Sequence, residues 1–411
     1  MTKNFFYIAQ YFTPEPYLKD IDFIKSIQKK GWNPVVITGF PNYPKGQIYE
    51  GYKNKLFFIE EMQGIKVIRT FTFADHSLNN FKRILNYAVF GILASFAILK
   101  YAKRDSFYYV LQSSPFVLFC AYTVRLFKKN SKILLDIQDL FPENIKVSGF
   151  VKQKWKIDIL DFVLNKFYYK TFDLFVTVSE SFRQIIIKKG FNENNVHTLY
   201  NWSMIESDLE NKIFDFKYST HGFNIAYAGN IGVHQGLSKL SNAITEITSR
   251  NNEIFFHFFG DGTDYEPLFK RLKNNKNVFF YGRVEPEEIS KYLYAANALF
   301  LHLIKDPIYE SIIPSKLQAY IEIGKPILAG LEGEARNFVE INKLGVTFDS
   351  ENEQEFVKAC IEISSFKEEN IMNIRERSLN LYQEKFSRKA GINNLNNFIL
   401  NHYDYSTKSK E

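Results

Sequence analysis

The sequence predicts an α/β protein with two doubly wound, Rossmann-like domains that face each other across a cleft. Three observations lead to this class. The chain has 411 residues, which is too long for one typical hydrophobic core. Short β-branched or aromatic runs alternate with helix-length periodic segments, as in βα units around a parallel sheet. A polar interval at residues 202–221 interrupts this alternation and predicts a linker.

The first domain is expected at residues 1–201. Its predicted strands are Phe5–Gln10, Pro34–Thr38, Ile65–Thr70, Phe107–Gln112, Lys132–Asp136 and Leu174–Val178. Helices are predicted between them, for example at Asp20–Lys30 and Ser179–Lys189.

The second domain is expected at residues 222–386, where the alternation restarts. Its predicted strands are Phe223–Ala228, Glu253–Phe258, Asn277–Tyr281, Ala298–His302, Pro326–Ala329 and Gly345–Phe348. A periodic segment at residues 387–403 predicts a helix that packs back on the first domain. In folds of this kind ligands bind at the carboxyl ends of the strands.

The composition argues against several classes of protein. Hydrophobic residues make up 45% and charged residues 24% of the chain, as in ordinary globular proteins. Cys120 and Cys360 match no metal or redox spacing, so we expect a reducing, cytoplasmic setting. The seven histidines show no metal-ligand spacing, and no nucleic-acid recognition module is visible. The N-terminal apolar run is too short for a signal peptide.

The chain contains a single Asp-x-Asp motif, Asp20-Ile-Asp22. It opens an amphipathic helix beside Lys19 and Lys25, so we interpret it as a solvated helix start and expect no metal there.

The net charge of +7 is concentrated in one part of the chain. Residues 81–129 hold eight basic residues against the single acid Asp105, and they enclose the 13-residue apolar run Tyr87–Leu99. That run is shorter than the roughly 20 residues that span a bilayer. A basic-flanked apolar helix indicates docking on an anionic membrane face. A second stretch, Lys152–Lys170, mixes Lys, Trp and Tyr with an apolar face, and a core helix with lysines extended to solvent is the alternative.

Three glycine turns follow predicted strands of the second domain. They contain Gly229, Asn230 and Gly232, then Gly260 and Gly262, then Gly282 and Arg283. Glycine lets the backbone approach a ligand closely, and the following helix directs its amides toward that ligand. None of the turns fits the dinucleotide glycine pattern or the mononucleotide phosphate loop.

The segment Pro314-Ser315-Lys316 predicts a further helix start. Proline and serine suit the first turn of a helix, and Lys316 then lies beside unpaired amides and the positive end of the helix dipole. Gly324 is expected to end this helix, and a buried strand begins at Pro326. Together with the glycine turns, this segment outlines a pocket for a nucleotide diphosphate.

These motifs, in their order, resemble a known family. The sequence resembles bacterial glycosyltransferase family 4, which has the two-Rossmann GT-B fold, in the branch of O-antigen, capsule and colanic acid transferases that includes L-fucosamine (N-acetylfucosamine) transferases. The matching segments cover nearly the whole chain and include Gln10–Pro16, Gly31–Thr38, Pro41–Gly46, Asp139–Glu143, Val178–Glu180, Tyr200–Trp202, Ala228–Gly232, Gly260–Gly262 and Pro314–Tyr320.

The resemblance implies a retaining, metal-independent transfer of a sugar from a nucleotide donor. For the donor it implies a site made by the three glycine turns together with Pro314, Ser315, Gln318 and Tyr320. Lys316 is expected to stabilise the leaving diphosphate, and Glu310 to reach the sugar ring. On the acceptor side it implies Gln10, Glu15, Tyr43 and Glu143, with Asp139 orienting or deprotonating the acceptor hydroxyl. Capping of a nearby helix is the alternative role of Asp139.

The chain departs from the wider family at the donor motif. Two glutamates separated by seven residues are usual there, whereas this chain has Ser311 and Ala319 at those positions. Gln318, Glu322, Glu332 or Glu334 is therefore expected to hold the ribose. Asn230 and His234-Gln235 replace the Arg and Lys that commonly follow the first glycine turn.

The resemblance also implies a substrate class and a location. The donor is expected to be a UDP-sugar carrying an N-acetylated amino or deoxyamino sugar. The acceptor is expected to be an undecaprenyl-diphosphate-linked saccharide of O-antigen, capsule or lipopolysaccharide synthesis, at the inner face of the cytoplasmic membrane. The alternatives are a transferase that uses GDP-mannose or GDP-fucose, and a non-catalytic GT-B scaffold.

Overall fold

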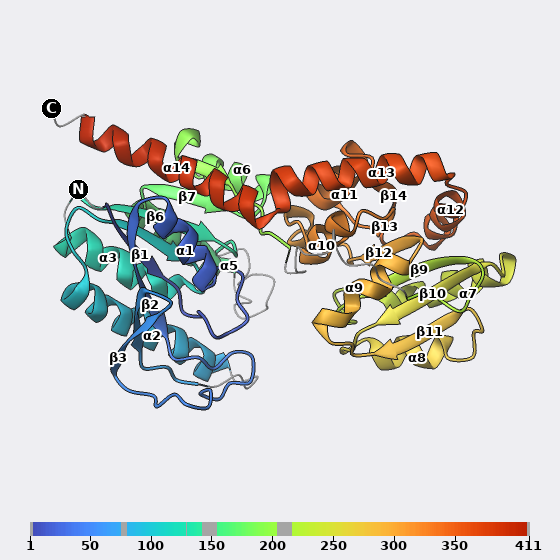
Figure 1. Ribbon diagram of the computed structural model, residues 1–411, viewed down its shortest axis with the longest axis horizontal. Coiled ribbons are helices and arrows are strands. Elements are labelled where there is room, and N and C mark those ends of the chain that lie inside the picture. Colours follow the sequence, from blue (N-terminus) through green and yellow to red (C-terminus); the bar gives the residue numbers. More distant parts are fainter. Residues whose placement is uncertain (1–2, 75–79, 129, 142–153, 204–215, 409–411) are drawn as a thin grey trace. The chain divides into compact units, whose positions relative to one another are not determined.

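A computed structural model of the chain describes residues 3–74, 80–128, 130–141, 154–203 and 216–408 (Figure 1). The chain forms two compact units. The first unit comprises residues 1–199 together with 392–411, and the second comprises residues 200–391. Of the predicted linker, residues 204–215 lie outside the described part of the chain.

The first unit is built on an eight-stranded sheet in the order β3-β4-β2-β1-β5-β6-β7-β8. Every neighbouring pair is parallel except β3 with β4. The strands are β1 (Lys3–Ile8), β2 (Trp32–Gly39), β3 (Phe57–Met62), β4 (Ile65–Thr70), β5 (Phe107–Leu111), β6 (Lys132–Ile137), β7 (Leu174–Thr177) and β8 (Val196–Thr198).

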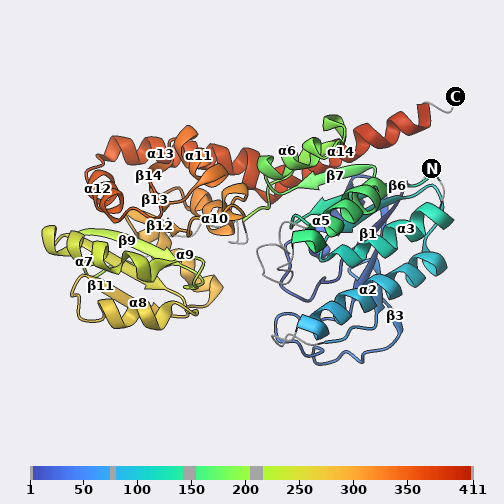
Figure 2. The same ribbon diagram turned by 180° about the vertical axis from the view of Figure 1, so that it is seen from behind.

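Helices cover both faces of this sheet. They are α1 (Ile21–Lys29), α2 (Asn80–Tyr101), η1 (Pro115–Val117), α3 (Leu118–Phe127), α5 (Lys154–Val163), η2 (Leu164–Tyr168), η3 (Tyr169–Thr171), α6 (Glu180–Lys188) and η4 (Glu193–Asn195). Seen from behind, α2, α3 and α5 lie as one layer over the same face (Figure 2). The last helix, α14 (Arg388–Lys408), contributes its C-terminal part to this unit, because Phe398 stacks on His197 and Tyr403 packs edge-on against Trp32.

The second unit has a six-stranded, fully parallel sheet in the order β11-β10-β9-β12-β13-β14. Its strands are β9 (Phe223–Ala228), β10 (Ile254–Phe259), β11 (Val278–Gly282), β12 (Ala298–His302), β13 (Ile327–Gly330) and β14 (Gly345–Phe348). Its helices are η6 (Leu237–Leu240), α7 (Ser241–Arg250), α8 (Tyr265–Leu272), α9 (Pro286–Ala295), η7 (Tyr309–Ser311), α10 (Ser315–Ile323), α11 (Gly333–Ile341), α12 (Glu353–Ser364), α13 (Glu368–Leu381) and η8 (Tyr382–Phe386).

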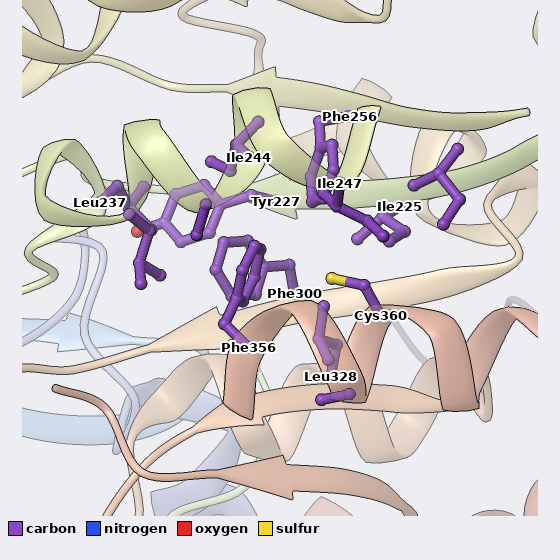
Figure 3. Close-up of a cluster of buried hydrophobic side chains, with 14 of the residues drawn as sticks. Ile225, Tyr227, Leu237, Ile244, Ile247, Phe256, Phe300, Leu328, Phe356 and Cys360 are labelled. Carbon is purple, nitrogen blue, oxygen red and sulfur yellow. The ribbon is translucent and has the colours of Figure 1, made fainter. Parts of the chain in front are cut away.

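Successive residues of β9 show why this sheet is covered on both faces. Ile225 and Tyr227 point into one apolar cluster, which also contains residues of α7 and α12 (Figure 3). Ala226 and Ala228 point into a second cluster with residues of α10 and α11. A parallel strand that is buried on both faces has an uninterrupted apolar sequence, which is the pattern used to predict it. The predicted fold class, α/β with two doubly wound Rossmann-like domains, is confirmed.

Two strands of the first unit were not predicted. The edge strand β3 pairs antiparallel with β4 through the two-residue turn Gln63-Gly64, in which both residues have positive φ, as tight hairpin turns require. Its sequence, Phe-Phe-Ile-Glu-Glu-Met, has few of the buried positions that identify the central strands. β8 has only three residues, too few to give a periodic signal.

The predicted starts of α1 and α10 are present, although no side-chain cap hydrogen bond is formed at α10. The Asp20 side chain accepts hydrogen bonds from the amides of Asp22 and Phe23, at 3.1 Å each, so Asp20-Ile-Asp22 is a capped helix start as interpreted. Pro314 is the residue before α10, and Gly324 ends that helix in the left-handed conformation, with φ 75°.

The apolar run Tyr87–Leu99 lies within a longer helix than its length suggested. α2 has 22 residues, and its segment Ile84–Tyr101 has a mean hydropathy of 1.6 with 33% of the segment buried. By length and composition alone, this is the one helix of the described chain that is both long and apolar enough to cross a membrane.

The interior of the first unit also contains a buried charge. Arg69 on β4 is fully buried, and its guanidinium donates to Glu60 Oε1 at 2.5 Å, to the Thr13 carbonyl at 2.6 Å and to the Gly39 carbonyl at 3.1 Å. These contacts tie β3, β2 and the loop after β1 to one side chain.

We expect Arg69→Leu to destabilise the first unit by about 3 kcal/mol, because the substitution leaves Glu60 and two buried carbonyls without their donor. Hydrogen exchange of β2 and β4 peptides in the full-length protein measures this loss. Lys25→Ala, which removes an exposed hydrogen bond to Gln63 in the same unit, is the matched control and should change protection little. Equal effects of the two substitutions would contradict the role given to Arg69.

Candidate functional site

The second unit contains a pocket of ≈ 440 Å³ at the carboxyl ends of β9, β10 and β11, beside the N-terminus of α10. Its walls are turns, one helix start and the apolar side of α9. The lining residues are Ala228, Gly229, Asn230, Phe259, Gly260, Asp261, Arg283, Val284, Ile289, Leu293, Lys316, Ala319 and Tyr320. The predicted position of a ligand at the strand ends of this domain therefore coincides with a real hollow.

The glycine turns form the floor of this pocket by packing directly on one another. The Gly229 amide donates to the Phe259 carbonyl at 2.8 Å, and the Gly260 amide donates to the Gly282 carbonyl at 2.7 Å. Gly260 has φ +139°, and a Cβ added there would lie 1.9 Å from the Gly229 carbonyl oxygen. No residue with a side chain fits this position, so the sequence requirement for glycine has a steric cause.

Lys316 extends from the first turn of α10 across this floor. Its Nζ lies 3.9 Å from the centre of the Tyr227 ring, and it donates to the Tyr227 hydroxyl and, at 3.2 Å, to the Asn230 carbonyl. A Cβ at Gly229 would lie 2.6 Å from Lys316 Cε, so this glycine makes room for the lysine tail. Tyr227, Asn230 and Gly229 thus hold the Lys316 ammonium group at the end of β9.

The surroundings of Lys316 lower the pKa of its side chain. Burial lowers the pKa of Lys316 to about 7, since the charged form loses hydration that its neighbours replace only in part. Its hydrogen-bond partners, a hydroxyl and a carbonyl, are neutral. A bound anion would favour the ammonium form and raise this pKa again. The site therefore becomes more cationic when an anion enters.

Two further features favour an anion at this place. The first amides of α10 have no acceptors within the helix and lie at the positive end of its dipole. Arg283, which is exposed, adds a guanidinium to the pocket wall. Phe259, Val284, Ile289 and Leu293 add apolar surface to the lining. The pocket thus offers cationic groups that suit a diphosphate and apolar surface that suits an uncharged portion of the same ligand.

The structure places the remaining predicted donor residues around the pocket rather than all inside it. Tyr320 lines the pocket, but its hydroxyl accepts from the Ala228 amide at 3.1 Å and donates to the Phe300 carbonyl at 3.2 Å, so it fixes the end of β9. Gln318 is buried and donates to the Ile313 carbonyl at 3.5 Å, away from the lining residues. The others that do not line the pocket are Gly232, Gly262, Gly282, Pro314 and Ser315.

The glutamates considered for the sugar and the ribose do not reach the pocket. Glu310 lies on η7 and is not a lining residue. Glu322 is buried, where burial raises its pKa, and it is hydrogen-bonded to the side chains of Ser203 and Tyr382. Glu332 accepts from the Ser350 amide at 3.4 Å, and Glu334 lies in the first turn of α11. Ala319, where the family has a glutamate, is part of the pocket wall.

Sequence reasoning missed several lining residues. Asp261 stands between two predicted glycines, and its carboxylate accepts from the Gly262 amide at 2.7 Å. Its position inside a glycine turn was an available signal. Val284, Ile289 and Leu293 have no such signal, because apolar residues at helical spacing are indistinguishable from core.

In the first unit, the predicted acceptor residues lie near a buried ion pair. Lys19 and Asp136 are both almost fully buried and pair directly, and the Tyr109 hydroxyl donates to the same carboxylate. Burial raises the pKa of Tyr17, and the nearby carboxylates of Asp136 and Asp139 raise it further. Asp139 is exposed at the carboxyl end of β6, so it lies beside this cluster and faces solvent.

The other predicted acceptor residues differ in their burial and in the hydrogen bonds that they already make. Gln10 is buried, its Oε1 accepts from the Ser113 hydroxyl at 3.3 Å, and its Nε2 has no partner among the described residues. Glu15 accepts from the amides of Phe12, Asn42 and Tyr43 at 2.8–2.9 Å, so it holds the loop that carries Tyr43. Tyr43 is 38% exposed and packs on Tyr11. Glu143 lies outside the described residues.

No group of three or more His, Cys, Asp or Glu side chains that could hold a metal ion occurs in the described ranges.

Comparison with known proteins relates this pocket to an enzyme family. Residues 210–378 match the family model described as "Glycosyl transferases group 1". A curated relative, the "Probable glycosyltransferase WbjE" of Pseudomonas aeruginosa, is 23% identical over 246 residues, which span 57% of this chain and 60% of the relative.

Solved structures show the same fold over nearly the whole chain. The structure described as "Trehalose-6-phosphate from E. coli bound with UDP-2-fluoro glucose" superposes with a TM-score of 0.70 at 9% identity. The match covers 96% of this chain and 99% of that chain. Anabaena Alr3699/HepE in complex with UDP and glucose gives a TM-score of 0.62 at 12% identity, covering 97% and 100%. The fold is GT-B. Together with the group 1 domain, it supports a glycosyltransferase.

We expect Gly260→Ala to weaken the binding of UDP by at least about tenfold, because the added Cβ would displace the Gly229 carbonyl from the pocket floor. Gly282→Ala is the matched control. It also carries a positive φ, +67°, but its Cβ would meet nothing within 4 Å, so the cost is backbone strain of about 1 kcal/mol. Isothermal titration with UDP compares the two, and equal losses of affinity would argue against the close packing as the cause.

The lowered pKa of Lys316 predicts a pH dependence of UDP binding. The bound diphosphate favours the ammonium form, so affinity should be greatest below about pH 7 and fall by up to about tenfold per pH unit above it. A phosphate is largely ionised in this range, since its second pKa is about 6. Lys316→Arg should remove the dependence, because arginine keeps its charge to above about pH 12. An unchanged slope in Lys316→Arg would assign the dependence to another group.

Proposed function

We propose that the protein is a retaining, metal-independent glycosyltransferase that uses a nucleotide-diphosphate sugar. The observation that carries the proposal is the pocket in which Lys316, the first turn of α10 and the glycine turns converge, within a group 1 domain. UDP is the favoured nucleotide, because two similar structures contain UDP-2-fluoro glucose or UDP.

In the proposed reaction the acceptor hydroxyl attacks the anomeric carbon on the face that the diphosphate leaves. The bond between that carbon and the phosphate oxygen breaks, and the departing phosphate takes the hydroxyl proton. Lys316, Arg283 and the α10 amides would stabilise the charge that develops on the diphosphate. No carboxylate serves as a covalent nucleophile in this scheme, and Asp139 would orient the acceptor hydroxyl.

For the substrates we propose an N-acetylated amino or deoxyamino sugar, such as N-acetylfucosamine, and an undecaprenyl-diphosphate-linked acceptor in surface polysaccharide synthesis. Support comes from the resemblance to that branch of transferases and from the name of the Pseudomonas relative. A lipid-linked acceptor would place the protein at the inner face of the cytoplasmic membrane.

Two alternatives remain as second candidates. GDP-mannose or GDP-fucose is the first, because no lining residue identifies the base. A non-catalytic scaffold is the second, since Ala319 lines the pocket where a glutamate is usual and Glu310 lies outside it. Direct assay separates these candidates.

Purified full-length protein, lipid extract and a panel of radiolabelled nucleotide sugars test the proposal. We expect one UDP-sugar to label the lipid fraction, with the same anomeric configuration in product and donor, and with no loss of rate in EDTA. Lys316→Ala should reduce the rate by about a hundredfold or more, because the leaving group loses its cation. Lys276→Ala, at an exposed lysine of the same unit, is the control.

If only a GDP-sugar labels the lipid fraction, the donor is a GDP-sugar and the assignment of a UDP-sugar is wrong. Absence of labelling with every donor, in protein that still binds UDP, would favour the scaffold. Inhibition by EDTA that magnesium reverses would overturn metal independence.

A further inference from the structure

We propose that α2, α3 and α5 of the first unit, with the adjoining η2, form a surface that docks on an anionic phospholipid bilayer. We call it the three-helix face. Twelve of the twenty large hydrophobic side chains exposed on the described chain lie on these elements. Leu126, Phe162 and Trp155 are the most exposed of them, at 66%, 59% and 61%. Such a concentration exceeds the scattered apolar residues of an ordinary surface.

These side chains belong to one continuous layer. α2 packs on α3, and the Tyr122 hydroxyl of α3 donates to the Phe167 carbonyl of η2 at 3.3 Å (Figure 2). α2 and α3 already bury their other sides, and η2 buries Leu164 and Tyr168. Ala94 and Ile98 of α2, like Cys120 and Val124 of α3, are buried. The exposed apolar residues therefore point away from the interior of the first unit.

The helices lie on the surface of the unit and are fixed there. Gly91 shows this for α2, because a Cβ at this position would lie 2.4 Å from the Phe116 carbonyl oxygen of η1. The segment Ile84–Tyr101 has the length and composition to cross a bilayer, but a third of it is buried in this packing. A position parallel to the membrane, with the outer side chains inserted, keeps the fold intact.

The charges at the ends of the three-helix face identify an anionic partner. Lys100, Lys103 and Arg104 are exposed at the C-terminal end of α2, and Lys166 and Lys170 are exposed beside η2. The described acids are Asp158 and Asp161 on α5 and Asp105 after α2, and Asp161 pairs with Lys189 at 3.5 Å. An apolar centre with basic ends matches acyl chains below phosphate headgroups.

A shallow hollow adds a place for an acyl chain. It has a volume of ≈ 550 Å³ and is lined by Leu56, Phe57, Leu93, Phe96, Leu99 and Lys100. Five of these side chains are apolar, and the lysine lies where a headgroup phosphate would be. The hollow therefore combines apolar side chains, which suit an acyl chain, with a lysine, which suits a headgroup phosphate.

This inference does not depend on the proposed reaction, because vesicle binding requires no donor and UDP binding requires no vesicle. The test is sedimentation of the full-length protein with vesicles of phosphatidylglycerol and phosphatidylcholine. We expect it to pellet with these vesicles and much less with phosphatidylcholine alone, and to lose the difference at high salt.

Two sets of variants separate the apolar and the charged contributions. Phe96→Ser with Leu126→Ser should reduce pelleting severalfold, and Lys100→Glu with Lys103→Glu should remove the preference for anionic vesicles. Ile341→Ser with Ile361→Ser, at exposed apolar positions of the second unit, is the matched control and should pellet as the unaltered protein does. All variants should keep the hydrogen-exchange protection of the β2 and β4 peptides, which shows that the first unit is folded, and they should bind UDP normally, which shows the same for the second unit.

Tryptophan fluorescence gives a second measurement. Trp155 is 61% exposed, whereas Trp32 and Trp202 are buried, so a blue shift on adding vesicles reports on α5. Trp155→Phe should abolish the shift. Two outcomes overturn the proposal: pelleting that is unchanged in Phe96→Ser with Leu126→Ser, or a protein that stays in the supernatant and instead forms a dimer sensitive to Leu126→Ser.

Discussion

The pocket of the second unit depends on the close approach of two backbone turns at the ends of β9 and β10. The Gly229 carbonyl occupies the space that a Gly260 side chain would need, and the Lys316 tail occupies the space that a Gly229 side chain would need. Because both positions lack Cβ atoms, three chain segments meet within van der Waals distance. The Tyr320 hydroxyl fixes the same strand end by bridging Ala228 and Phe300. The position of the ammonium group thus follows from backbone packing rather than from a paired acid.

The buried Lys19 and the half-buried Lys316 show how surroundings decide the use of one residue type. Lys19 is paired with Asp136 inside the first unit, so its charge already has an opposite charge beside it. Lys316 has a carbonyl, a hydroxyl and an aromatic ring around it, and burial lowers its pKa. Of the two, only Lys316 has neutral groups around its ammonium, so the negative charge of a ligand can stabilise it further. This contrast is the physical reason to look for an anion at the second unit and not at Lys19.

The sequence predicted the central strands well because a parallel strand buried on both faces has an uninterrupted apolar run, as in β5 or β9. It did not predict β3 or β8, whose signals are weak at an edge or in three residues. In the pocket it predicted the residues that a steric or capping rule requires, such as Gly260 and Lys316. It could not place Glu310, nor assign Val284 and Leu293 to a pocket wall, because those facts depend on how α9 and η7 pack.

The three-helix face was predicted only in part from the sequence, again because it depends on how the helices pack. Periodicity identifies an apolar helix, but a helix that is apolar on all sides gives no indication of which side faces the sheet. The structure separates the two sides: Ala94 and Ile98 of α2 are buried, whereas Ile92 and Phe96 are exposed. In a domain surrounded only by water, the outward side of such a helix would be polar. Three neighbouring helices that keep apolar outward sides, with lysines at their ends, match the docking on a lipid surface that we propose.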